Sequence, residues 1–119
     1  MSYDIHFKVK VEGIDEWIYV GNCEANTTWN VRKIIELSTG LPWLNCENNG
    51  FCKDIIPCIE KGYNELTYHP EIYKKYEAKN GWGTVEGTRD FFGKILKAWR
   101  DLKRYEENDL LDVVTFWIE

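Results

Sequence analysis

The sequence lacks any long run of apolar residues. No window approaches the roughly 18 uninterrupted apolar residues of a membrane helix. Residues 1–12 alternate charged and apolar side chains, where a secretory signal would need an apolar region. Internal repeats, low-complexity tracts and Pro/Ser-rich linkers are also missing. We therefore expect a single domain over residues 1–119, with no membrane partner and a cytoplasmic location.

Positive charge is also scarce. The chain has 20 Asp and Glu against 15 Lys and Arg, a net charge of −5, which excludes a histone-like or strongly basic nucleic-acid binder. What the sequence has instead is 44% hydrophobic residues, including 6 Trp, 7 Tyr and 5 Phe. Such a composition is far too apolar for a disordered chain. We expect a folded acidic domain with no nucleic-acid partner.

Residue types that perform catalysis are few and scattered. His6 falls on the polar side of a predicted strand and His69 precedes a proline, and neither has an evident carboxylate or nucleophile partner. Glu86 and Asp90 are four residues apart and could share a metal ion, but acidic residues near the start of a helix are ordinarily explained by the helix dipole. We therefore expect a protein without a catalytic group, a cofactor or a metal.

The four cysteines allow three interpretations: buried small hydrophobic residues, metal ligands or a disulfide framework. Zinc sites usually supply their cysteines in close pairs such as C-x2-C, and the gaps here are wider. The spacing favours buried thiols, because free cysteine is among the most buried residue types. The residues concerned are Cys23, Cys46, Cys52 and Cys58.

The hydrophobic pattern predicts three strands. Residues 3–11 alternate apolar and charged side chains with a period of two, residues 12–15 supply a glycine-containing turn, and residues 17–20 are aromatic and β-branched, which predicts a hairpin. Residues 111–118 predict a third strand with large side chains on both faces. Such a strand is usually central in its sheet, or packs one face on helices and the other on a partner chain.

Between these strands the apolar period becomes helical. One helix is capped by Thr27 or Thr28 and stops at Gly40, a second begins near Asp54 with Pro57 in its first turn, and a short one follows His69 and Pro70. The longest covers about residues 84–105. The expected order is ββα(αα)αβ. This is an α+β fold in which a small antiparallel sheet, the N-terminal hairpin plus the C-terminal strand, packs against three to four helices.

Most aromatic residues follow these periods, but two do not. Trp29 and Trp82 stand at predicted helix starts beside amides and glycines, where a ligand rather than the core could be their partner. The residues expected in the core are Phe7, Trp17, Phe92, Trp99 and Phe116.

A basic stripe lies on the polar side of the predicted long helix. Lys94, Lys97, Arg100 and Arg104 could bind phosphate, but Asp90 and Asp101 fall within pairing distance of these cations along the helix. The stripe is therefore interpreted as a solvated face with intrahelical ion pairs.

The loop that opens the long helix is the first candidate ligand site. Its residues combine backbone N–H groups at a helix start, glycines that allow close approach and an indole that can stack on a planar group. This combination suits a nucleotide-like anion, although the loop lacks the strand context of a dinucleotide fingerprint and a Walker lysine. The alternative is a glycine-rich turn with a tryptophan plugging the core. The candidate residues are Asn80, Gly81, Trp82, Gly83 and Thr84.

The start of the first helix is the second candidate site. Amide, hydroxyl and indole groups gather there, and ordinary helix capping is the alternative explanation. If the two helix starts lie together, two N-termini and two indoles converge on one pocket. The candidate residues are Asn26, Thr28, Trp29 and Asn30.

Four short motifs occur in order along the chain. They are a T-aromatic-N-V helix start at residues 28–31, Gly-Leu at 40–41, P-x-x-Y at 70–73, and N-G-W-G at 80–83 followed by Glu86. In these motifs the chain resembles a family of small uncharacterised proteins from bacteriophages, prophages and their bacterial hosts. Trp29 stands where tyrosine is commoner in that family, and the cysteines at 46, 52 and 58 are not features of it. The resemblance implies a phage or prophage origin and points to Asn30 and Trp82, but it brings no established activity.

Two functions from different classes follow from these observations. The first is a non-enzymatic accessory protein that binds or sequesters a small anionic, nucleotide-like ligand at the two helix starts. The alternative is a protein-binding accessory or inhibitory factor that acts on a host protein or as a homo-oligomer, for example a homodimer.

Overall fold

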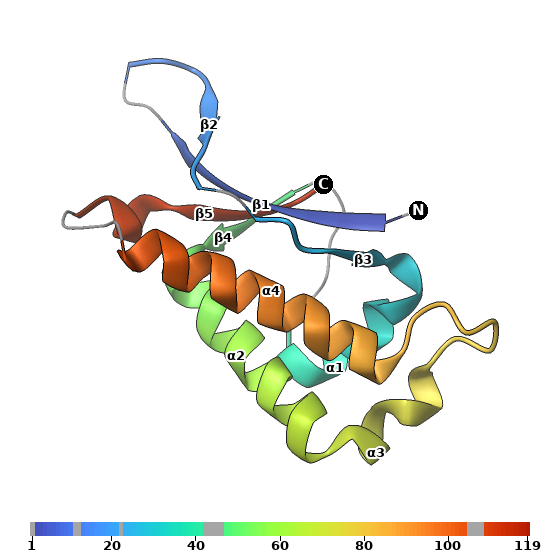
Figure 1. The fold of residues 1–119 in the computed structure, drawn as a ribbon. Coiled ribbons are helices and arrows are strands. Elements are labelled where there is room, and N and C mark those ends of the chain that lie inside the picture. Colours follow the sequence, from blue (N-terminus) through green and yellow to red (C-terminus); the bar gives the residue numbers. More distant parts are fainter. Residues whose placement is uncertain (1, 11–12, 22, 42–46, 105–108) are drawn as a thin grey trace.

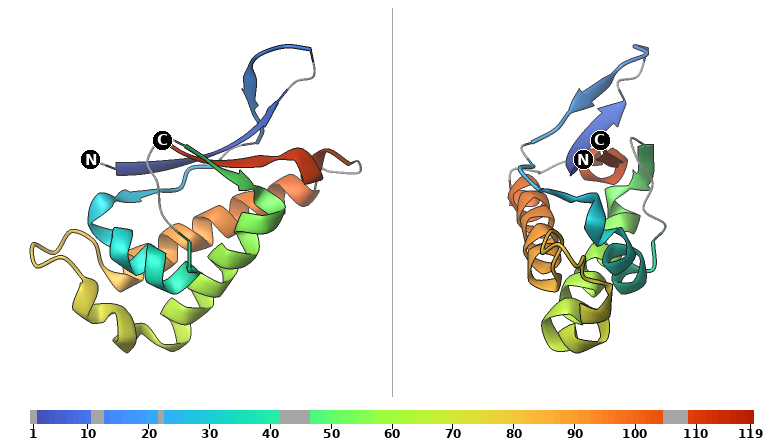
Figure 2. Two further views of the ribbon diagram at one scale, coloured as in Figure 1. Left: turned by 180° about the vertical axis from the view of Figure 1, so that it is seen from behind. Right: turned by 90° about the vertical axis from the view of Figure 1, so that its right-hand side faces the viewer.

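The computed structural model describes residues 2–10, 13–21, 23–41, 47–104 and 109–119. One layer is a five-stranded antiparallel sheet and the other consists of helices that cover one face of it (Figures 1 and 2). The α+β class expected from the sequence is confirmed. In chain order the elements are β1 (Ser2–Lys10), β2 (Trp17–Tyr19), β3 (Asn26–Thr28), η1 (Trp29–Val31), α1 (Arg32–Thr39), β4 (Glu47–Phe51), α2 (Cys52–Tyr68), α3 (Pro70–Tyr73), η2 (Lys74–Tyr76), α4 (Val85–Arg104), η3 (Asp109–Val113) and β5 (Thr115–Ile118).

The sheet is built around β1. Its path runs β2-β1-β5-β4, and β3 pairs with the first residues of β1. The predicted hairpin is confirmed, with Lys8 opposite Tyr19. The predicted last strand lies between β1 and β4, with Phe7 opposite Phe116, but it is shorter than expected. The reason is local, because residues 109–113 form the 3-10 turn η3 and the N–H of Val114 bonds back to the carbonyl of Leu111 at 3.4 Å.

Two strands were not predicted. β4 has the sequence Glu-Asn-Asn-Gly-Phe, and β3 has Asn-Thr-Thr. Asn and Gly are depleted in strands, and neither segment alternates apolar and polar residues, so only pairing with β5 and β1 explains their extended conformation. β4 also contains a register shift between Asn48 and Gly50, where Gly50 has φ 121°.

The start and the end of the first helical segment agree with the prediction from the sequence. Thr28 caps it, since its hydroxyl accepts a hydrogen bond from the backbone N–H of Asn30, and Gly40 ends α1 with φ 77°. The second helix differs from the prediction, because α2 begins at Cys52, whose N–H donates to the carbonyl of Val114 at 2.8 Å. Pro57 therefore lies inside the helix, past the first turn, where it removes one bond from the backbone ladder.

The core lies between the helix-facing side of the sheet and the three long helices. Phe7, Phe92, Trp99 and Phe116 are buried, as expected. Trp17 is not, and that assignment was wrong: the residue is 37% exposed. Its register opposite Lys10 places it on the outer face of the sheet, where its ring meets that of Trp117 at 5.1 Å.

Gly62 on α2 lies against both α1 and α4. A Cβ atom at this position would lie 2.7 Å from Thr39 Cγ2 and 2.8 Å from Phe92 Cε2. A Cβ atom there would force these side chains to shift, so the glycine permits the close packing of the three helices.

The basic stripe is exposed and partly paired along the helix. Lys97 contacts Asp101 at 3.5 Å, whereas Asp90 pairs with Arg89 at 3.4 Å and not with Lys94. The side chain of Arg104 lies outside the described part of the chain.

The described cysteines are free thiols. Cys52 is buried, and Cys23 and Cys58 are half-buried, while Cys46 lies outside the described residues. Burial raises the pKa of the Cys23 and Cys52 thiols, so both are protonated near neutral pH. Among the described residues we find no cluster of potential metal ligands and no helix long and apolar enough to cross a membrane.

Candidate ligand-binding site

The two helix starts singled out in the sequence lie against each other. A Cβ atom at Gly83 would be 3.0 Å from Asn30 Cβ, 3.1 Å from Val31 Cγ1 and 3.3 Å from the backbone carbonyl carbon of Asn30. Gly83 has φ 107°, a conformation that L-residues rarely adopt. The backbone of the Gly-Trp-Gly loop is therefore pressed onto the η1 turn, which no sequence spacing could reveal.

The loop at residues 78–84 is closed by its own hydrogen bonds. The N–H of Ala78 donates to the carbonyl of Gly83 at 3.4 Å, and the N–H of Gly81 donates to the carbonyl of Ala78 at 3.2 Å. The side-chain oxygen of Asn80 accepts from the N–H of Trp82 at 2.9 Å, which forms an Asx turn. These bonds hold the loop in a conformation that leaves Trp82 70% exposed.

The N-terminus of α4 is already partly satisfied by the protein itself. The carboxylate of Glu77 accepts from the N–H of Val85 at 2.8 Å, and the hydroxyl of Thr84 accepts from the N–H of Gly87 at 2.9 Å. Thr84 is thus the N-cap, and Glu77 supplies the negative charge that the helix dipole favours. An external anion at this helix start would have to compete with Glu77.

The other helix start faces partly inward. Trp29 is half-buried and stacks on Tyr3, with ring centroids 5.7 Å apart and an interplanar angle of 27°. Its indole Nε1 is buried without a hydrogen-bond partner, a donor that a bound water or ligand acceptor could satisfy. Burial raises the pKa of the Tyr3 hydroxyl, so this side chain stays neutral.

The residues of the two candidate sites are brought together only in part. Asn30 is exposed and lies against Gly83, next in sequence to Trp82. Asn26 pairs with Asp4 within β3 and β1, further from the loop. The indoles of Trp29 and Trp82 do not form one pocket wall, because the first packs on Tyr3 and the second projects into solvent.

The site is therefore an exposed surface. It joins the 78–84 loop to the η1 turn, and we call it the Trp82 surface, defined by Asn30, Asn80, Gly81, Trp82 and Gly83. The three cavities described for this fold lie elsewhere. Lys79, next in sequence to Asn80, is an exposed cation with no ion pair among the described residues.

Two residues that shape this surface escaped the sequence reasoning. Glu77 caps a helix from eight residues away, a spacing that matches no capping motif. Tyr3 was predicted to lie in a strand, but its stacking on Trp29 depends on the antiparallel pairing of β1 with β3.

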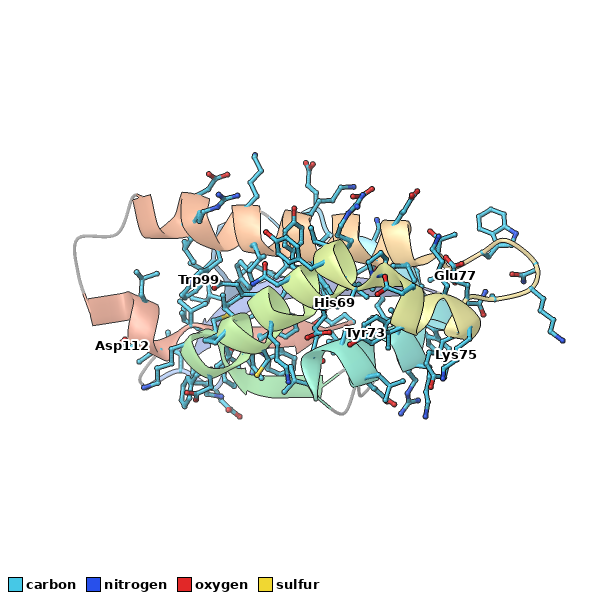
Figure 3. All side chains as sticks on the ribbon, turned by 90° about the horizontal axis from the view of Figure 1, so that it is seen from below. His69, Tyr73, Lys75, Glu77, Trp99 and Asp112 are labelled. Carbon is cyan, nitrogen blue, oxygen red and sulfur yellow. The ribbon has the colours of Figure 1, made fainter. Side chains whose placement is uncertain are left out.

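The segment that leads into the loop is fixed to α2. The hydroxyl of Tyr73 donates to Glu65 Oε2 at 3.0 Å, and burial together with this carboxylate raises the pKa of Tyr73 to about 12. Tyr73 and Glu77 lie at one end of the helical layer (Figure 3). The tyrosine of the P-x-x-Y motif therefore anchors the segment before the loop and does not belong to the Trp82 surface.

Comparison with known proteins gave no match. No protein-family model, no curated protein and no solved structure corresponds to this chain. The resemblance to phage and prophage proteins stays a prediction.

Proposed function

We propose that the chain is a non-enzymatic accessory protein of phage or prophage type that binds a small nucleotide-like ligand at the Trp82 surface. The observation that carries this proposal is the exposure of Trp82, 70%, on a loop that is held by three internal hydrogen bonds. A large apolar ring that an ordered loop keeps in water lacks the favourable free energy of burial. A planar ligand that stacks on the ring supplies this burial.

The polar groups of the Trp82 surface match a nucleobase better than a bare anion. Asn30 offers an exposed amide with donor and acceptor atoms. Lys79 supplies one cation for a phosphate, while Glu77 holds the helix dipole that a phosphate would otherwise use. The ligand is therefore expected to owe most of its affinity to the base and less to the phosphate.

A thermal-shift screen tests this function. The panel contains nucleoside monophosphates, cyclic nucleotides, the corresponding nucleosides and inorganic phosphate. A ligand present at 100 times its Kd adds about 2.7 kcal/mol to stability, which for a domain of this size raises Tm by about 10 °C. We expect nucleosides to retain most of the shift and phosphate alone to give none.

Matched variants locate the effect. Trp82→Ala abolishes the shift, and Trp82→Phe keeps part of it because a ring remains for stacking. Tyr68→Ala is the control, since Tyr68 is 71% exposed at the end of α2 and outside the Trp82 surface. If the wild type shows no shift with any member of the panel, the proposal is wrong.

Exposed apolar residues on β2 and on the turn before it favour a second function, binding of another protein. Ile14, Trp17, Ile18 and Tyr19 are 52%, 37%, 47% and 58% exposed, and the hairpin extends beyond the helices (Figure 1). β2 lies at the end of the sheet path. Because the N–H of Val20 bonds to Phe7 O, the register turns the backbone groups of Trp17 and Tyr19 toward the free edge.

Light scattering and pull-down distinguish the possible partners of β2. A homodimer reports about twice 14.1 kDa, and Ile18→Lys returns it to a monomer. A monomer that retains one host protein, and loses it in Ile18→Lys, indicates a foreign partner. A monomer that retains nothing contradicts this second function.

A further inference from the structure

A groove between α2 and α4 is the largest cavity described for this fold. It has a volume of about 780 Å³ and reaches η3 at one end. This volume falls in the range of small-molecule sites. Trp99 and Asp112, which both line the groove, lie at the end of the helical layer opposite Glu77 (Figure 3). The groove is thus separate from the Trp82 surface, and an inference about it does not depend on the proposed function.

The floor of the groove is apolar. Ile56 and Trp99 are each 6% exposed, and Leu96 and Leu111 are half-buried against the core. Tyr63 borders the floor where it lies against Gly93, at which a Cβ atom would be 3.4 Å from its ring. An apolar ligand in the groove would therefore lose its contact with water along most of one side.

Two cations stand at the same end of the groove. α2 and α4 run antiparallel (Figure 1), and Tyr63 lies against Gly93. Lys53 precedes Tyr63 by ten residues and Arg100 follows Gly93 by seven, so both lie roughly 10–15 Å from that crossing, in the same direction. Neither cation has an ion pair among the described residues.

The remaining charges do not cancel this pair. Lys97 is bound to Asp101 at 3.5 Å, and Glu60 lies nearer the crossing of the two helices, within one turn of Tyr63. Asp112 is the carboxylate at the η3 end among the residues described as lining the groove. That end therefore carries two cations against one carboxylate. The excess of one positive charge complements a ligand with one negative charge.

We propose that this groove binds a small amphiphile with an apolar body and a single anionic head group such as a carboxylate. The apolar floor takes the body, and Lys53 and Arg100 take the head group. A neutral ligand leaves one positive charge of this end uncompensated, and a cationic ligand is repelled by it.

Isothermal titration with dodecanoate, below its micelle concentration, tests the proposal. Dodecyltrimethylammonium is the matched probe, since it has the same chain and the opposite charge. We expect saturable binding of one dodecanoate and at least tenfold weaker binding of the cation. Arg100→Glu and Lys53→Glu each weaken dodecanoate by about three- to tenfold, the effect expected when a partly exposed pair becomes a repulsion.

Lys94→Glu is the control for net charge. It makes the same charge change on the same helix, but Lys94 borders a different cavity, beside Gly21 and Glu24. Its affinity for dodecanoate should stay within twofold of the wild type. Circular dichroism checks that each variant folds, and Arg100→Gln replaces Arg100→Glu if the latter does not.

Four results would each overturn the proposal. They are the lack of saturable dodecanoate binding, equal affinity for the two amphiphiles, unchanged affinity in the folded Arg100 variant, and an equal loss in Lys94→Glu. The first rejects the apolar groove as a ligand site, and the other three reject the cations as the source of its selectivity.

Discussion

Gly83→Ala should destabilise the fold through two separate effects. The first is the backbone conformation, because φ 107° costs an L-residue about 1–3 kcal/mol. The second is the added Cβ, which would lie 3.0–3.3 Å from Asn30 and Val31, including a backbone atom that cannot rotate away. Such overpacking typically costs about 1–3 kcal/mol. The two effects together lower the free energy of unfolding by about 2–6 kcal/mol.

Gly81→Ala separates these effects. Gly81 belongs to the same loop and has φ 80°, but no atom lies within 4 Å of the position its Cβ would take. Only the conformational cost applies, about 1–2 kcal/mol for a left-handed residue. The difference between the two variants therefore measures the close approach of the loop to the η1 turn.

Urea denaturation followed by circular dichroism gives both values. Each variant should keep the m-value of the wild type, so that the midpoint reports stability alone. We expect Gly83→Ala to be less stable than Gly81→Ala by at least 1 kcal/mol. Equal losses would refute the reasoning, because the loop and the η1 turn would then not be in contact and the Trp82 surface would not exist as one unit.

Three further predictions concern the helices and the sheet. Gly62→Ala should lower the free energy of unfolding by about 1–3 kcal/mol, because its Cβ would press on Thr39 and Phe92. Gly93→Ala, whose Cβ makes only an ordinary contact, should be neutral or should stabilise the fold by up to about 1 kcal/mol. Thermal melts that rank the two variants the other way contradict the packing of α1, α2 and α4. Thr84→Ala should cost about 1 kcal/mol through the lost cap of α4, and a calorimetric melt identical to that of the wild type would disprove that role. The hydrogen bond from Lys8 holds the pKa of Glu119 below its ordinary value of 4.5. The stabilising effect of this pair is therefore complete above pH 4.5 and is lost as pH falls through the lower pKa of the folded state. Glu119→Gln should flatten the acid side of the curve of stability against pH, and an unchanged curve would exclude the pair.

Local patterns explain much of the fold. The alternation of β1, the Thr28 cap and Gly40 stop around α1, and the apolar stripe of α4 each depend on residues close in sequence, and each was predicted. Their physical basis is the fixed period of a strand or helix and the chemistry of its ends.

The rest depends on contacts between distant residues. β4 is extended only because β5 lies beside it, and Trp17 is exposed because its register with β1 turns it away from the helices. The candidate site follows the same rule. Its residues were identified from chemistry alone, but their contact through Gly83, and the carboxylate of Glu77 at the start of α4, come from tertiary structure.

Amide NMR spectra recorded during a titration with the nucleoside and nucleotide panel test the central claim most directly. The claim is that Trp82 and Asn30 present one recognition surface. We predict that a binding member of the panel shifts signals in residues 78–84 and residues 28–31 together, with the indole N–H signal of Trp82 among the largest changes. A panel that shifts no signals, or shifts only those of the groove between α2 and α4, would contradict it.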